Sequence, residues 1–296
     1  MKYVFIIASL FLGLTNCKNR MQTNQEHFLV KEIPDQTPVA FQPSLTPTGK
    51  IIHRGIFSPD FKAYYYTISD KKFEKFDVWM IQKENGHWST PQKAFFNSDF
   101  SEHGMSFSPD GNTLYFSSTR PTNVEGVAAT WHIWKSKKVD GKWSKSTFVD
   151  IPNCRDKLVS HPSVTNAGTL YFHTSNMDYS NMQVGMATLT NGQYGNAKAL
   201  GLLAKGNGTC TPYISPNEDY LIFANIGNKL DLWVAFKDKE GNWTKLRQLP
   251  DKINQQGQGN PSISPDGQFL FFTTGDHQGN NWTVKWVNVV DDLQNK

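Results

Sequence analysis

A short turn motif recurs five times along the chain, and its regular spacing constrains the fold more than any other feature of the sequence. The steps between successive copies are 50, 57, 50 and 49 residues. A repeat of this length indicates an architecture in which each copy is one supersecondary unit. The copies are FSPDFKAYYYT (57–67), FSPDGNTLYFS (107–117), VTNAGTLYFHT (164–174), ISPNEDYLIFA (214–224) and ISPDGQFLFFT (263–273).

Two further landmarks keep the same period. A strand signature follows each turn, as DVW (77–79), HIW (132–134), DLW (231–233) and VKW (284–286), with the weaker QVG (183–185) in the third copy. A turn of Gly, any residue and an aromatic comes next in the first four copies, as GHW (86–88), GKW (141–143), GQY (192–194) and GNW (241–243). Pro, Asp and Gly favour tight turns, whereas aromatic-rich runs favour strands. Each unit therefore predicts four short antiparallel strands, which is the blade of a β-propeller.

The last copy lacks a fourth strand, because the chain ends soon after TVKWVNVV (283–290). A missing strand would leave a long open sheet edge, which invites aggregation. The apolar stretch VAFQPSL (39–45) belongs to no repeat, and its proline suits an outermost strand. We predict an all-β propeller of five four-stranded blades, closed by this N-terminal strand pairing with the last blade. Six blades is the alternative, if residues 119–131 or 28–50 form a degenerate blade.

The first residues, MKYVFIIASLFLGLTNC, have the form of an export signal: a lysine precedes an apolar run too short to span a bilayer. Residues 1–17 are predicted to be a signal peptide, residues 18–27 a polar tether and residues 28–296 a single propeller domain. The sequence Leu14-Thr15-Asn16-Cys17 resembles the lipobox of bacterial lipoproteins, which implies lipidation at Cys17. An ordinary secretory signal with an incidental cysteine is the alternative. In both cases we expect export to the bacterial cell envelope, with a lipidated chain anchored on the periplasmic side or at the cell surface.

From about residue 51 to residue 290, the turns closely resemble the WD40-like PD40 repeat of TolB-type periplasmic propellers. The departures are Phe61 for Gly in the first copy, Asn166-Ala167 for Pro-Asp in the third and Glu218 for Gly in the fourth. The resemblance implies an extracytoplasmic binding or docking module, in a family that includes enzymes only occasionally.

Composition and motifs exclude several function classes. The net charge is +4, from 30 basic and 26 acidic residues, with no basic run of the kind that nucleic-acid binding needs. No P-loop, GxGxxG or GxSxG motif occurs, so no nucleotide cofactor and no serine esterase chemistry is expected. Beyond Cys17, only Cys154 and Cys210 remain, and whether they form a disulfide in an oxidising compartment stays open.

Ligands of propellers meet the face where the inner strands begin, around the mouth of the central channel. The residues just before each predicted inner strand are polar in every copy. They form either a ligand pocket or a set of strand caps that face a water-filled channel. The candidate binding residues are His53, Arg54, Glu102, His103, Arg155, His161, Thr209 and Asn260, together with Trp131 and Trp282, which break the period of the other tryptophans.

The sequence favours a monomeric, membrane-tethered binding propeller that recognises an envelope protein or a glycan at the channel mouth. The alternative is a polysaccharide lyase or hydrolase, with His103 or His161 as base and Arg54 or Arg155 steadying an acidic sugar. That alternative needs the two imidazoles within about 10 Å of each other. No metal site is assigned, since the histidines lack a local ligand spacing. A purely structural scaffold is the third possibility.

Overall fold

The computed structural model describes residues 28, 32–202, 206–275 and 282–294. The predicted signal peptide (1–17), with its lipidation site Cys17, and the tether (18–27) lie outside these residues. Within the described part of the chain, no helix is long and apolar enough to cross a membrane.

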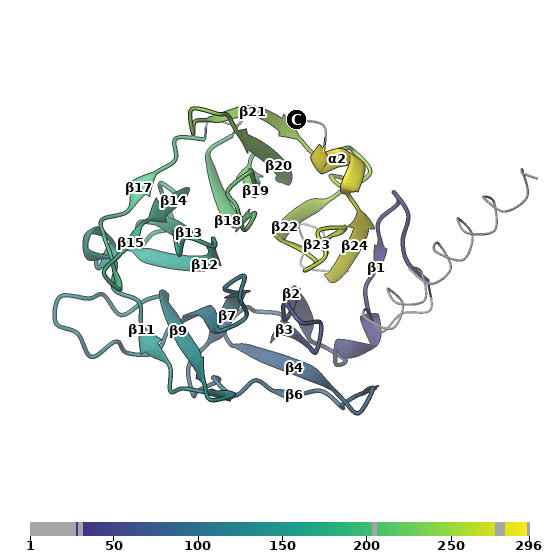
Figure 1. Ribbon diagram of the computed structural model, residues 1–296, viewed down its shortest axis with the longest axis horizontal. Coiled ribbons are helices and arrows are strands. Elements are labelled where there is room, and N and C mark those ends of the chain that lie inside the picture. Colours follow the sequence, from purple (N-terminus) through teal and green to yellow (C-terminus); the bar gives the residue numbers. More distant parts are fainter. Residues whose placement is uncertain (1–27, 29–31, 203–205, 276–281, 295–296) are drawn as a thin grey trace, which may run out of the picture.

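Five antiparallel sheets form a ring around a central axis (Figure 1). The predicted five-bladed propeller is confirmed, and residues 119–131, one proposed location of a sixth blade, carry no strand. From the axis outward, the first blade contains β2 (Ile51–Phe57), β3 (Ala63–Ser69), β4 (Phe76–Glu84), β5 (His87–Trp88) and β6 (Gln92–Lys93), and the second contains β7 (Glu102–Phe107), β8 (Thr113–Ser118), β9 (His132–Val139), β10 (Lys142–Trp143) and β11 (Thr147–Phe148). The third blade contains β12 (Leu158–Val164), β13 (Leu170–Ser175), β14 (Gln183–Ala187) and β17 (Lys198–Ala199), with the hairpin β15 (Leu189–Thr190) and β16 (Gln193–Tyr194). The fourth contains β18 (Gly208–Ile214), β19 (Tyr220–Ile226), β20 (Leu230–Lys237) and β21 (Trp243–Gln248), and the fifth contains β22 (Gly257–Ile263), β23 (Phe269–Gly275), β24 (Thr283–Asn288) and β1 (Val39–Ala40).

The repeated turn ties the first strand of a blade to the second through its serine. The Ser58 hydroxyl lies 2.6 Å from an oxygen of Asp60 and accepts the backbone N–H of Ala63 at 2.9 Å. The same pair of contacts recurs at Ser108 and at Ser264. The turn aspartates are therefore structural, as their place in the motif predicts.

The ring is closed by the N-terminal strand, as predicted. β1 pairs antiparallel with β24, with Val39 opposite Trp286 and Ala40 opposite Lys285. The Phe41 N–H continues the ladder to the Val284 carbonyl at 2.8 Å. Apart from β1, the described residues 32–50 contain only the 3₁₀ turn η1 (Pro43–Leu45), so this described part of the segment forms no sixth blade.

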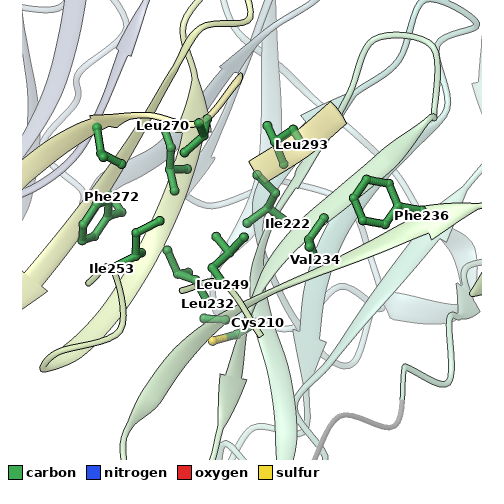
Figure 2. Close-up of a cluster of buried hydrophobic side chains, with 13 residues drawn as sticks. Cys210, Ile222, Leu232, Val234, Phe236, Leu249, Ile253, Leu270, Phe272 and Leu293 are labelled. Carbon is green, nitrogen blue, oxygen red and sulfur yellow. The ribbon is translucent and has the colours of Figure 1, made fainter. Parts of the chain in front are cut away.

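The hydrophobic core is divided into five clusters of buried side chains, one for each contact between neighbouring blades. Figure 2 shows the cluster between the fourth and fifth blades, where Ile222 and Leu232 lie with Leu270 and with Leu293 of the short helix α2 (Val290–Gln294). Cys210 belongs to this cluster and Cys154 to the one between the second and third blades. Both thiols are free and buried, and no disulfide joins them.

Phe41 adds side-chain packing to the β1 ladder that closes the ring. Its ring lies 5.0 Å from Tyr64 of the first blade and 5.3 Å from Trp286 of the last, measured between ring centroids. Phe28, fully buried, packs 5.2 Å from Trp286 in the same cluster. The N-terminal segment therefore joins the first and last blades through side chains as well as through hydrogen bonds.

Phe41→Ala should lower the free energy of unfolding by about 3–5 kcal/mol, because it leaves a cavity between the first and last blades. Val39→Ala is the matched control: Val39 is 44% exposed, and its loss should change stability by less than about 0.5 kcal/mol. Urea unfolding followed by tryptophan fluorescence measures both. Equal effects at the two positions would contradict the closure role of Phe41.

Candidate functional site

Each inner strand carries a β-bulge that includes the residue four positions before the turn serine or threonine, and in the first blade the bulge begins one position earlier than in the others. A bulged residue leaves the ladder, so its side chain can be aimed differently from those of its neighbours. The bulged residues have a positive φ in the second to fifth blades, between 45° and 62°. At this position the first blade has Arg54, and the second to fifth blades have Gly104, His161, Thr211 and Asn260.

The backbone N–H groups at the bulges bind side chains of the preceding blade. The His161 N–H donates to the Ser117 hydroxyl at 2.9 Å, and the Thr211 N–H donates to His173 Nδ1 at 3.2 Å. The Asn260 N–H donates to the Thr211 hydroxyl at 3.2 Å. Buried backbone donors need such partners. These polar groups near the axis therefore have a structural role, because their hydrogen bonds join one blade to the next.

Four imidazoles gather around the channel mouth, which is the end where the inner strands begin. The ring centroids of His103 and His161 lie 4.4 Å apart, and those of His161 and His173 lie 4.8 Å apart. Phe76 separates the fourth imidazole, His53, from the others, with its ring 5.3 Å from His53 and 5.4 Å from His103. His53, His103, His161 and His173 are called the imidazole cluster below.

The Ser160 hydroxyl contacts two imidazoles of the cluster and the hydroxyl of Ser117. Its Oγ lies 3.0 Å from His103 Nε2, 3.1 Å from His161 Nδ1 and 3.0 Å from Ser117 Oγ. His53 is held separately, with Nε2 2.7 Å from the Ser69 hydroxyl. Each imidazole in the cluster therefore uses one ring nitrogen in a contact within the protein.

The imidazole cluster is uncharged at neutral pH. Burial lowers the pKa of His53 and of His173 to about 4. Burial is also the main reason why the pKa values of His103 and His161 lie well below the usual range, and the positive charges of neighbouring imidazoles and of Arg54 lower them further. A neutral imidazole can accept a proton or a hydrogen bond, so the mouth has basic groups without a net charge of its own.

Aromatic side chains border the imidazole cluster. The Trp131 ring lies 4.1 Å from His103, and the Trp282 ring lies 5.5 Å from His53. Phe73, which is 41% exposed, lies 5.7 Å from Trp282. We call Phe73, Phe76, Trp131 and Trp282 the mouth row.

Two of the charged residues predicted for the site have partners elsewhere. Glu102 is fully buried and forms an ion pair with Arg120 at 2.8 Å, which secures the loop after β8. Arg155 forms an ion pair with Asp150 at 2.5 Å, and both side chains are about two-fifths exposed. Neither residue contacts the imidazole cluster. Arg54 lies within electrostatic reach of His103 and His161.

The two remaining predicted residues lie in different places. Asn260 is half-buried beside the channel, and its side-chain amide donates to the Thr273 hydroxyl at 3.4 Å. Thr209 lies off the axis, where its hydroxyl accepts the Val184 N–H at 2.9 Å. Thr209 also lines a cavity of about 450 Å³ between the third and fourth blades, with Asn176 among its polar walls.

Sequence reasoning missed His173 and Phe76, although the repeat contained a signal for both. His173 stands in the second strand where the second copy has Ser117, so it is the one imidazole in a row of small residues. Phe76 and Trp131 each come directly before the third-strand signature, and the third and fourth copies have Met182 and Leu230 there. Aligning the copies column by column would have placed both residues at the mouth.

Within the described residues, no group of three His, Cys, Asp or Glu side chains is placed to hold a metal ion. The imidazole cluster comes closest, but its rings make contacts with hydroxyl groups and with one backbone N–H. Among the described residues, the chemistry at the mouth is that of neutral bases, hydroxyls and aromatic faces.

No protein-family pattern matches the sequence, and no curated protein matches it either. Solved structures are similar in fold. A thermostable family-43 glycoside hydrolase is 14% identical, with a TM-score of 0.50, and the match covers 83% of this chain and 91% of the hydrolase. A TolB protein from Agrobacterium tumefaciens is 16% identical, with a TM-score of 0.48, over 86% of this chain and 98% of that protein.

TolB from Acinetobacter baumannii is also similar, at 18% identity and a TM-score of 0.44. The match covers 79% of this chain and 54% of that protein, so the chain spans about half of its length. At these identities, the likeness to all three structures is one of fold alone.

The buried imidazoles make stability depend on pH. The pKa of His173 is about 4 in the folded chain, against about 6.5 for an unperturbed histidine, so the unfolded chain binds more protons between these values. Stability should therefore fall as the pH drops from about 6.5 towards 4. His53 has the same shift and should add to the effect.

His173→Gln should make this dependence shallower, because glutamine can still accept the Thr211 N–H but does not titrate. Denaturant midpoints measured from pH 7.5 to pH 4 test this. His87→Gln, at an exposed hairpin position, is the control and should leave the slope unchanged. A slope unchanged in His173→Gln would contradict the assignment of a titrating imidazole at this position.

Proposed function

We propose that this chain is an exported binding propeller, anchored to the cell envelope through Cys17, that docks a protein partner over the channel mouth. The observation that carries the proposal is the mouth row. Aromatic side chains in contact with one another supply large apolar area at low entropic cost, and such residues dominate binding energy in protein interfaces.

Exposed apolar side chains extend the mouth row over the loops of the same end. They are Phe100, Val124, Met177 and Tyr179, from connections in the first three blades, and like Phe73 of the mouth row each is between 39% and 63% exposed. Apolar groups gathered on one end of a monomer mark an interaction surface more often than scattered ones do. The surface supports a partner that spans several blades.

A protein fits this surface better than a glycan does. A sugar needs several directed hydrogen bonds in addition to a ring to stack on. At the mouth, one nitrogen of every clustered imidazole is already used within the protein, and Glu102 is buried against Arg120. The loops around the mouth expose apolar groups beside charged ones such as Lys72, Asp99 and Glu125. Apolar contacts bordered by charged and polar side chains are typical of protein interfaces.

Phe73→Ser combined with Tyr179→Ser should reduce partner capture at least tenfold, which corresponds to about 1.4 kcal/mol or more. Both residues are exposed, so the fold should persist. The measurement is quantitative pull-down from detergent-solubilised envelopes with the mature chain, followed by titration of the captured protein. Val139→Ser is the matched control, because Val139 is 59% exposed on a hairpin at the opposite end.

Capture that is equally strong in the double variant and in the control would overturn the proposal. A glycan array run on the same proteins distinguishes the other ligand class. Glycan binding that is lost in Phe73→Ser and kept in Val139→Ser would replace the protein partner with a glycan at the same surface.

A second function, lyase chemistry on an acidic polysaccharide, is favoured by one observation. His103 and His161 lie 4.4 Å apart between ring centroids, well inside the distance that a shared reacting centre requires. Both imidazoles are neutral and can act as bases. Arg54 would hold the sugar carboxylate, since Arg155 is paired with Asp150.

The binding proposal predicts no turnover of uronic-acid polymers by the purified mature chain. Release of unsaturated uronides, followed by ultraviolet absorbance, is the measurement. Turnover that is lost in His161→Gln would establish the enzyme instead of the binding module.

A further inference from the structure

Arg54 is a buried cation with unused hydrogen-bond donors. It is 2% exposed, and its Nε and Nη1 atoms have no hydrogen-bond partner within the described structure. These two nitrogens carry three of the five N–H groups of a guanidinium. Buried donors of this kind are nearly always satisfied in folded proteins. The exception therefore calls for an explanation.

No carboxylate of the described chain compensates this charge. Burial lowers the pKa of Arg54 only to about 10, so the guanidinium remains protonated at neutral pH. The ionisable groups that interact electrostatically with Arg54 are Tyr213, His103 and His161, and none of them is an anion at that pH. Buried charges are normally paired or bound to a ligand. The geometry leaves room for an anion that the chain itself does not supply.

A cavity leads to Arg54 from the end opposite the mouth. It has a volume of about 410 Å³, within the range of small-ligand sites, and Arg54 is part of its lining. Prolines of four repeated turns, including Pro59 and Pro265, surround its opening. This end is called the turn side below.

The walls of the cavity combine polar and apolar side chains, and the one carboxylate among them, Asp266, already accepts hydrogen bonds from Ser264 and Gln268 within its own turn. Hydroxyl groups come from Ser106 and Tyr213, among others, and apolar surface comes from Phe57, Ile214 and Ile263. Such a lining suits a ligand with one charged group and an apolar body. One carboxylate matches the single charge of Arg54, whereas a phosphate dianion would bury a second charge without a partner.

We infer that the turn-side cavity binds the carboxylate of a linear ligand, with the carboxylate at Arg54 and an apolar body between Phe57 and Ile214. The same chemistry is offered by a free aliphatic carboxylate and by the C-terminus of a peptide with an apolar last residue. This site lies at the other end of the channel from the proposed partner surface, so either proposal can fail while the other stands.

Hexanoate and hexanamide are the first pair of probes, because they have the same apolar body and differ in charge. In titration calorimetry on the mature chain, hexanoate should bind and hexanamide should bind at least tenfold more weakly. A pentapeptide ending in leucine, with a free or an amidated C-terminus, is the second pair. The pair with the larger difference identifies the source of the carboxylate.

Arg54→Met should reduce carboxylate affinity at least tenfold and should not lower the melting temperature, since it removes an unpaired buried charge. A purely structural arginine would show the opposite change in melting temperature. Arg155→Met is the matched control, because Arg155 lies outside the channel; it should leave affinity unchanged.

Ser106→Phe tests the direction of entry and serves as a second variant should Arg54→Met not fold. The phenyl ring would fill the turn-side cavity, so it should abolish hexanoate binding while partner capture at the mouth persists. The inference is overturned if the wild-type chain binds neither carboxylate, if hexanamide binds as well as hexanoate, or if Arg54→Met or Ser106→Phe retains the wild-type affinity for the carboxylate that binds.

Discussion

The pairing of β1 with β24 is the contact on which the rest of the structure depends. Every blade buries its faces only against two neighbours, so a ring with one open junction would expose two apolar sheet faces at once. The β1 ladder is short, but Phe28 and Phe41 insert between the first and last blades and pack on Trp286. Side-chain packing and ladder hydrogen bonds therefore close the ring together. The channel and both of its ends exist because this junction is shut.

Sequence reasoning predicted the architecture because the repeat expresses it locally. The Ser-Pro-Asp-Gly turn works through contacts between residues two to five positions apart, as at Ser58, so the motif reports its own structure. The closing strand was also predictable, since a propeller blade of three strands leaves an edge that some other segment must cover. One copy of the turn would predict only a hairpin, whereas five copies at a regular spacing predict the whole propeller.

The candidate site was only partly predictable, because its groups meet across blades. Arg120 and Glu102 form an ion pair within one blade, and nothing in their spacing removed Glu102 from the set of candidates. His173 comes from a second strand, whereas the predicted site residues were those before the inner strands and the two aperiodic tryptophans, Trp131 and Trp282. The separation of the site's groups depends on how neighbouring blades pack, as for His103 of the second blade and His161 of the third. A single sequence does not contain that distance, although aligning the five copies would have narrowed the choice.

The charge of Arg54 couples the two ends of the channel electrostatically. Its positive charge is one of the causes that keep the pKa values of His103 and His161 below the usual range, after burial and the neighbouring imidazoles. An anion beside Arg54 would cancel part of that potential and so raise the proton affinity of both imidazoles. By linkage, protonation of either imidazole would strengthen anion binding by the same free energy. The neutral imidazoles at the mouth and the cation below them thus form one electrostatic unit, in which an anion bound at the turn side would change the proton affinity of the imidazoles at the mouth.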